Sequence, residues 1–85
     1  MHDLNDLFFY VQVVDNGGFA PAGRKLGTPK SKLSRRIALL EERLGVRLIQ
    51  RSTRQFVVTE IGQDYYRHCV AIVVVADLRH HKLSR

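Results

Sequence analysis

The strongest constraint on the fold is a Gly-Thr-Pro turn between two short helical segments. Gly27 lies where the chain must reverse, and glycine readily adopts the positive φ that such a turn favours. Thr28 can cap the next helix through its hydroxyl. Pro29 fits the first helical position, because an N–H would have no partner there. With Leu26 and Leu33 spaced to pack between the segments, these residues predict a helix-turn-helix motif.

Apolar residues recur at steps of three and four on both sides of this turn, which is the spacing of one helical face. Helices are expected over about residues 4–15, 21–26 and 29–44, the last ending at Gly45. Glu41 and Glu42 are expected on the exposed face of the third helix. The side chains expected to be buried are Leu4, Leu7, Phe8, Val11 and Val14 on the first helix, and Leu33, Ile37, Leu40 and Leu44 on the third.

The pattern changes over residues 46–58, where two short strands joined by a basic loop are the simplest interpretation. A hairpin directly after the second helix of a helix-turn-helix is a wing, placed to approach a minor groove. Thr59 can cap a last helix over about residues 60–83, and Glu60 favours the positive end of its dipole. The predicted fold class is mainly α: a winged helix-turn-helix with a three-helix core, a two-stranded wing and a long C-terminal linker helix.

Apolar side chains cover a wide sector of this last helix. We expect one side to pack on the domain and the other on the same helix of a second copy, giving a homodimer. The residues predicted for the dimer helix are Tyr65, Cys69, Ile72, Val73, Ala76 and Leu83. Cys69 could be a redox sensor, but its helical spacing favours a buried packing residue.

Positive charge is concentrated around the predicted turn and wing. The 85 residues carry a net charge of +6. Residues 24–54 contain ten Lys or Arg against two Glu, whereas the rest of the chain is slightly acidic. Such a basic block is the electrostatic footprint of a surface that binds a polyanion, and it coincides with the helix-turn-helix.

Several function classes find no support in the sequence. Cys69 is the only cysteine, which excludes an intrachain disulfide and a multi-cysteine zinc site. The four histidines do not favour a metal site, and no cofactor is expected. A glycine-rich phosphate loop and a nucleophile with a histidine partner are both missing, so an enzyme is not expected.

The N-terminal sequence lacks the features of a secretory signal, and the apolar run at 70–76 is far shorter than the roughly 20 residues of a membrane span. A cytoplasmic protein without membrane contact is therefore expected.

Six short motifs occur in one order along residues 4–66. They are Leu4-Asn5-Asp6-Leu7, Gly18-Phe19, Arg24-Lys25-Leu26-Gly27, Leu33-Ser34-Arg35-Arg36-Ile37, Leu40-Glu41-Glu42-Arg43-Leu44-Gly45 and Thr59-Glu60-Ile61-Gly62. In this order they closely resemble the winged helix-turn-helix domain of LysR-type transcriptional regulators. The end of the third helix followed by a basic wing is the most specific part of the resemblance.

The resemblance implies sequence-specific binding of double-stranded DNA for transcription regulation. The third helix would enter the major groove, the wing would meet the minor groove and the last helix would form the dimer. Base contacts would come from Lys30, Ser31, Ser34 and Arg35; phosphate contacts from Lys32, Arg36, Ser52 and Thr53; and the wing contact from Arg51 or Arg54. Arg35 is the strongest candidate, since its guanidinium can bind guanine O6 and N7 together.

The sequence departs from the family pattern in ways that affect these expectations. Regulators of this family normally continue into an effector-binding domain, and these 85 residues stop near the end of the linker helix. The sequence is either a fragment or a naturally short protein, and in both cases no small-molecule effector site is expected within it. Residues 1–58 would form the DNA-binding domain and residues 59–85 the linker helix. Lys30 and Ser31 replace a common Gln-Pro pair, and Ile61 replaces a small residue. Gly23 replaces an alanine, at an expected cost of about 1 kcal/mol.

Two alternatives to sequence-specific regulation remain open. A truncated regulator could act as a protein-interaction module that pairs with full-length relatives through its linker helix. An RNA-binding or chromosome-coating protein would instead bind nucleic acid strongly but without sequence preference.

Overall fold

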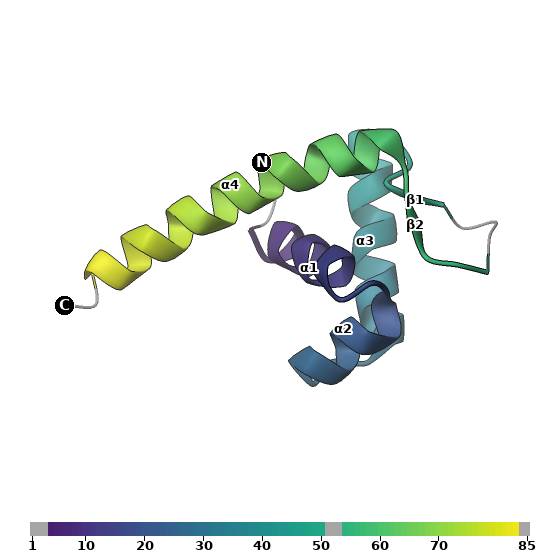
Figure 1. Ribbon diagram of the computed structural model, residues 1–85, viewed down its shortest axis with the longest axis horizontal. Coiled ribbons are helices and arrows are strands. Elements are labelled where there is room, and N and C mark those ends of the chain that lie inside the picture. Colours follow the sequence, from purple (N-terminus) through teal and green to yellow (C-terminus); the bar gives the residue numbers. More distant parts are fainter. Residues whose placement is uncertain (1–3, 51–53, 84–85) are drawn as a thin grey trace.

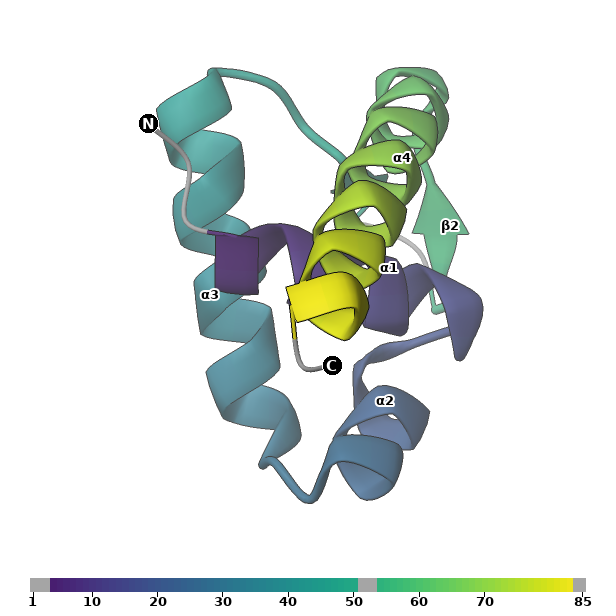
Figure 2. The same cartoon turned by 90° about the vertical axis from the view of Figure 1, so that its left-hand side faces the viewer.

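The computed structural model describes the backbone of residues 4–50 and 54–83, and the side chains of residues 4–50 and 54–76. Helices α1, α2 and α3 form a compact group, and α4 crosses over α1 and extends beyond it (Figures 1 and 2). This arrangement agrees with the predicted fold class. The elements are α1 (Leu4–Asp15), α2 (Phe19–Leu26), α3 (Lys30–Leu44), β1 (Ile49–Gln50), β2 (Val57–Val58) and α4 (Glu60–Leu83).

The core lies where α1 contacts α3 and α4. Its fully buried large side chains are Tyr10 and Val13 from α1, Leu33, Ile37 and Leu40 from α3, Leu48 and Ile49 at the start of the wing, and Cys69 from α4. The Tyr10 hydroxyl donates a hydrogen bond to the Gly62 carbonyl at 2.8 Å. Because this bond joins residues 52 positions apart, it ties the first helix to the first turn of the last.

The predicted buried face of α1 is partly wrong. Leu7 and Val11 are buried, but Leu4 is 54% exposed and Phe8 is 38% exposed. The buried sector also includes Asp6, which is 3% exposed. It is wider than one stripe because both α3 and α4 pack against α1.

The turn between α2 and α3 confirms the role of Gly27, which has φ of +67° and ends α2 in the left-handed conformation. Two details differ from the prediction. α2 begins at Phe19 instead of Pro21, since a proline in the first helical turn removes only an N–H that has no intrahelical partner. Thr28 does not cap α3, because Pro29 is itself the N-cap residue and the helix begins at Lys30.

Gly23 allows α2 to approach this turn closely. A Cβ atom at this position would lie 2.5 Å from the Thr28 carbonyl oxygen and 3.4 Å from the Lys30 backbone nitrogen. The expected penalty relative to alanine is therefore wrong for this chain, because the packing requires a residue without a side chain.

The wing and the start of α4 are joined through Thr59. In the wing, Ile49 pairs with Val58 and Gln50 with Val57 in antiparallel register. The Gly62 N–H donates to Thr59 Oγ1 at 2.9 Å, which confirms the predicted cap of α4. The Thr59 N–H donates to the Leu48 carbonyl at 2.9 Å.

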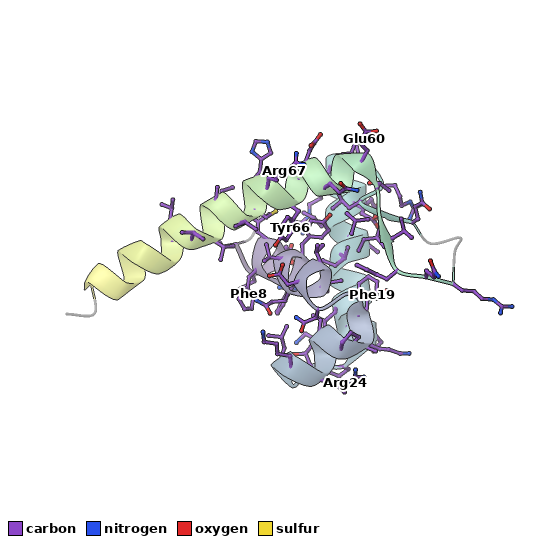
Figure 3. The ribbon with its side chains drawn as sticks, viewed as in Figure 1. Phe8, Phe19, Arg24, Glu60, Tyr66 and Arg67 are labelled. Carbon is purple, nitrogen blue, oxygen red and sulfur yellow. The ribbon has the colours of Figure 1, made fainter. Side chains whose placement is uncertain are left out.

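The side of α4 that contains Cys69 packs on its own domain and not on a second copy. Cys69 is fully buried within its own chain, and Tyr65 and Val73 pack on the same core. The burial of Cys69 confirms the predicted packing residue. The prediction that it faces a second copy is wrong, because α4 covers α1 along this row. Tyr66 also points toward α1, where its hydroxyl donates to Asp15, whereas Arg67 lies on the opposite side of the helix (Figure 3).

A second sector of α4 remains exposed. Its large apolar residues are Ile61, Ile72, Val74 and Val75, which are 44 to 55% exposed. Ala76 is half-buried, and the side chain of Leu83 lies outside the described residues. Within residues 4–50 and 54–83, no helix combines the length and the apolar content needed to cross a membrane.

Cys69 leads to a prediction about stability at alkaline pH. Burial raises the pKa of its thiol from 9.0 to about 11. Between these two values the folded chain keeps a proton that the unfolded chain releases, so the free energy of unfolding is expected to fall as pH rises from about 9 to about 11. Denaturant unfolding at a series of pH values checks this. In Cys69→Ala the free energy of unfolding should fall less steeply with pH, by the contribution of up to one bound proton. An unchanged slope of free energy against pH would contradict the buried-thiol interpretation.

Candidate nucleic-acid interface

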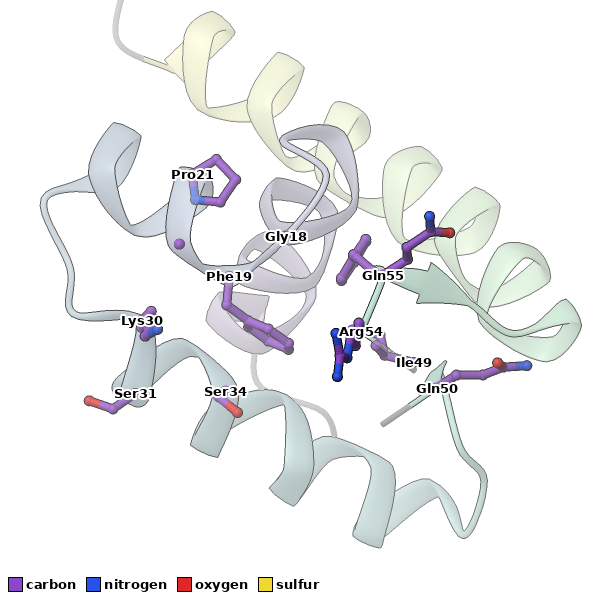
Figure 4. A pocket seen from close by; sticks show the side chains of 12 residues that line it. Gly18, Phe19, Pro21, Lys30, Ser31, Ser34, Ile49, Gln50, Arg54 and Gln55 are labelled. Carbon is purple, nitrogen blue, oxygen red and sulfur yellow. The ribbon is translucent and has the colours of Figure 1, made fainter. Parts of the chain in front are cut away.

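An open groove of about 540 Å³ lies between the start of α2, the start of α3 and the wing (Figure 4). Its apolar lining includes Phe19 and Phe56, whose rings meet edge to face with centroids 6.1 Å apart. This aromatic contact holds the base of the wing against α2. The polar side chains that line the groove are Lys30, Ser31, Ser34, Gln50, Arg54 and Gln55.

The structure brings together four of the predicted DNA-contacting residues. Lys30, Ser31 and Ser34 follow one side of the groove along α3, and Arg54 reaches it from the wing (Figure 4). Lys30, Ser31 and Arg54 are exposed, whereas Ser34 is half-buried. Residues 20 or more positions apart in the sequence therefore share one surface.

Other predicted residues lie beside this groove or outside the described part of the chain. Arg35 and Lys32 are exposed on α3 but do not line the groove. The residues of the wing loop that lie outside the described residues are Arg51, Ser52 and Thr53. The groove also includes Gln50 and Gln55, which sequence reasoning missed; their positions next to the basic loop could have indicated them.

The N-terminal turn of α3 is suited to an anion. It contains Lys30 and Lys32 but no acidic residue, and its N-cap residue makes no side-chain hydrogen bond. Backbone N–H groups at a helix start carry partial positive charge; in α3 those of Lys32 and Leu33 donate to the Pro29 carbonyl. Together with Lys32, which is predicted to contact phosphate, they favour binding of a phosphate group at this end of α3.

Arg36, predicted to contact phosphate, takes part in packing within the domain. Its Nε atom lies 3.1 Å from Asp6 Oδ1, and its guanidinium carbon lies 5.4 Å from the centre of the Phe9 ring. Arg43 donates to the other Asp6 oxygen at 2.5 Å. We therefore assign Arg36 to the contact between α1 and α3.

Asp6 is a structural residue that the sequence pattern did not reveal. Its carboxylate is almost fully buried and is paired with two arginines of α3. Its spacing of four and seven residues from Tyr10 and Val13 puts it on their side of the helix, but only the tertiary structure shows that this side is buried at Asp6 and that two arginines pair with it.

A metal site is not present among the described side chains, since no three His, Cys, Asp or Glu residues lie close enough to hold an ion there. His80 and His81 have side chains outside that part of the chain.

Comparison with known proteins gives a family for this fold. Residues 4–63 match the family described as bacterial regulatory helix-turn-helix protein, lysR family. An HTH-type transcriptional regulator from Xanthomonas campestris is 48% identical over 71 residues, which cover 84% of this chain and 21% of that protein. CrgA from Neisseria meningitidis is 43% identical over 68 residues, covering 80% of this chain and 23% of CrgA. The chain thus spans about a fifth of the length of these relatives.

Solved structures show the same architecture. The BenM DBD in complex with catB site 1 DNA superposes with a TM-score of 0.92 at 31% identity, covering 99% of this chain and 94% of that chain. The CrgA structure gives a TM-score of 0.76 at 36% identity and covers 99% of this chain and 29% of CrgA. The sequence motifs, the wing and these similarities agree, and the chain belongs to the LysR family of bacterial regulatory helix-turn-helix proteins.

Proposed function

We propose that this domain regulates transcription by reading the sequence of double-stranded DNA, with α3 in the major groove and the wing at the adjacent minor groove. The observation that carries the proposal is the groove shared by Lys30, Ser31 and Ser34 of α3 and Arg54 of the wing. The similarity to the BenM DBD, which was solved with catB and benA DNA, supports the same type of partner. This role places the chain in the cytoplasm.

The dimensions of α3 suit a major groove. Its 15 residues give a length of about 22 Å, and a helix about 10 to 12 Å across fits a groove about 12 Å wide. In this placement Lys30, Ser31, Ser34 and Arg35 would face base edges. Lys32 would contact phosphate together with the loop residues Ser52 and Thr53. Arg54 or Arg51 would enter the minor groove, whose readout depends on groove width and on A·T against G·C content.

We also infer a homodimer formed by the exposed side of α4. Burying large apolar side chains such as Ile72 and Val75 against a second copy would remove them from water. A two-fold dimer presents two recognition helices to a partly palindromic site whose half-sites are separated by about one helical turn or a multiple of it.

A charged substitution at Ile72 tests the dimer. Ile72→Glu is expected to raise the dimer dissociation constant at least about 100-fold, because each copy loses an apolar contact and gains a buried charge. Gln63→Glu introduces the same charge at another exposed position of α4 and serves as the control. Sedimentation equilibrium of the three proteins measures the effect, and equal dissociation constants would exclude this face.

Selection of bound duplexes from a random DNA pool, at near-physiological salt, tests the proposed function. An enriched motif with two-fold symmetry is expected. Retention of duplexes without enrichment would instead indicate binding to the backbone alone and favour a coating role. No retention would contradict DNA binding and favour the alternative in which α4 serves only to pair with other regulators.

A further inference from the structure

Glu41 is a buried carboxylate at the end of α3. Sequence reasoning expected it on an exposed face, but it is only 6% exposed. Its Oε2 atom accepts hydrogen bonds from the backbone N–H groups of Leu48 at 2.7 Å and Ile49 at 3.1 Å. Its Oε1 atom lies 3.8 Å from the guanidinium of Arg47. The side chain of an α3 residue therefore binds the backbone at the point where the wing begins.

The backbone of the same residue ends the helix. The Gly45 and Val46 N–H groups both donate to the Glu41 carbonyl, at 2.8 and 3.3 Å. Gly45 then reverses the chain with φ of +71°. Glu41 thus contacts both ends of the short connection from α3 to β1, and this restricts the directions in which the wing can leave the helix.

A further contact joins the residue before β1 to the residue after β2 and to α4. The Leu48 carbonyl accepts hydrogen bonds from the Thr59 backbone N–H at 2.9 Å and from Thr59 Oγ1 at 3.2 Å. The same hydroxyl oxygen caps α4 at Gly62. A change at Glu41 would therefore reach the whole hairpin, including the segment that carries Arg54.

We propose that Glu41 is a positioning residue for DNA reading. It holds the wing at a fixed position relative to α3, and so sets how far apart along the DNA the bases contacted by α3 and the base steps contacted by the wing lie. The proposal rests on the proposed function, because it assigns separate parts of one DNA site to α3 and to Arg54. Glu41 itself touches no DNA in this scheme. A carboxylate side chain suits the role, since its Oε2 atom accepts from two amides at once and hydrogen bonds to a charged acceptor are stronger than those to a neutral one.

Glu42 provides a matched control. It is the next residue of the same helix, carries the same charge and is exposed. Glu42→Ala and Glu42→Gln therefore repeat the change in net charge without removing the contact to Leu48 and Ile49. Any general effect of added positive charge on DNA affinity appears in both pairs of variants.

Random-pool selection with the wild-type chain and the four variants tests the proposal. The Glu42 variants are expected to give the wild-type motif. Glu41→Ala should keep the base preference at positions that face α3 but lower the preference at the flanking positions that face the wing at least about fivefold. Glu41→Gln retains one acceptor oxygen and should lose less of the preference at the flanking positions. Because Glu41→Ala and Glu41→Gln remove the same charge, a change in charge alone would not produce this difference between them.

The outcomes separate the two proposals. A wild-type chain without an enriched motif would contradict the proposed function, and the role of Glu41 with it. A wild-type motif that the Glu41 and Glu42 variants share unchanged would overturn the role of Glu41 alone, as would an equal loss at central and flanking positions. If circular dichroism shows that Glu41→Ala does not fold, Glu41→Gln is compared with Glu42→Gln instead. A loss of preference at the flanking positions in Glu41→Gln alone then supports the role of Glu41, and equal motifs overturn it.

Discussion

Replacing Gly62 with alanine is expected to destabilise the domain by at least about 3 kcal/mol, at the upper end of the effect of overpacking a core. A Cβ atom there would overlap the Leu48 carbonyl oxygen and would lie 2.8 Å from Val58 Cγ1 and 2.9 Å from the Tyr10 hydroxyl. The Tyr10 hydroxyl also donates to the Gly62 carbonyl. Helix α4 would therefore have to move away from α1 and the wing together.

The sign of the result is informative because helix propensity predicts the opposite. Gly62 lies in α4 without positive φ, where alanine would favour the helix by about 1 kcal/mol. A domain of 85 residues has about 4 to 13 kcal/mol of stability, so the expected loss is a large part of it.

Denaturant unfolding monitored by circular dichroism measures the effect of Gly62→Ala. Gly45→Ala is the control, because Gly45 has positive φ but the added Cβ would meet no atom within 4 Å apart from its chain neighbours. It should cost only about 1 to 2 kcal/mol, the penalty of a left-handed conformation for a residue with a Cβ atom. If Gly62→Ala is as stable as the wild type, α4 does not approach the wing as closely as the structure shows.

The boundaries of the elements could be predicted from the sequence because local residues determine them. Gly27 and Gly45 end α2 and α3 in the left-handed conformation, and Thr59 caps α4. Each of these depends on a residue and its neighbours within four positions. The start of α2 was missed by two residues, because Pro21 is compatible with either boundary.

Buried polar groups could not be predicted, because their burial depends on partners far away in the sequence. Asp6 pairs with Arg43, which is 37 positions away. Glu41 is buried against amides of the wing, although its neighbour Glu42 is exposed. A charged residue in a helical pattern is ordinarily placed on the solvent face, and only the tertiary structure shows that these two are not.

The candidate site and the exposed side of α4 also depend on contacts between residues far apart in the sequence, which the sequence pattern does not show. The predicted residues of α3 followed from a local motif, and the groove that joins them to Arg54 depends on the position of the wing. The wide apolar sector of α4 indicated two partners. It did not show that the row containing Cys69 faces the domain, which leaves Ile72 and Val75 exposed.

Arg35→Ala is expected to remove sequence preference at one base position of each half-site. A bidentate contact from arginine to guanine O6 and N7 contributes about 1 to 3 kcal/mol of discrimination, or roughly 5- to 150-fold. Alanine cannot replace either hydrogen bond. Arg35 is exposed on α3 next to the groove, so the substitution should leave the free energy of unfolding nearly unchanged.

Lys32→Ala provides the contrast, because it removes a positive charge from the same helix but is assigned to phosphate. It should weaken binding to all sequences by a similar factor. It should also reduce the slope of log binding constant against log salt concentration by about one. Titrating each variant with the selected site and its single-base variants, at several salt concentrations, separates base reading from backbone contact. If both variants weaken binding without altering base preference, Arg35 contacts phosphate and the reading of that base pair belongs to another residue of α3.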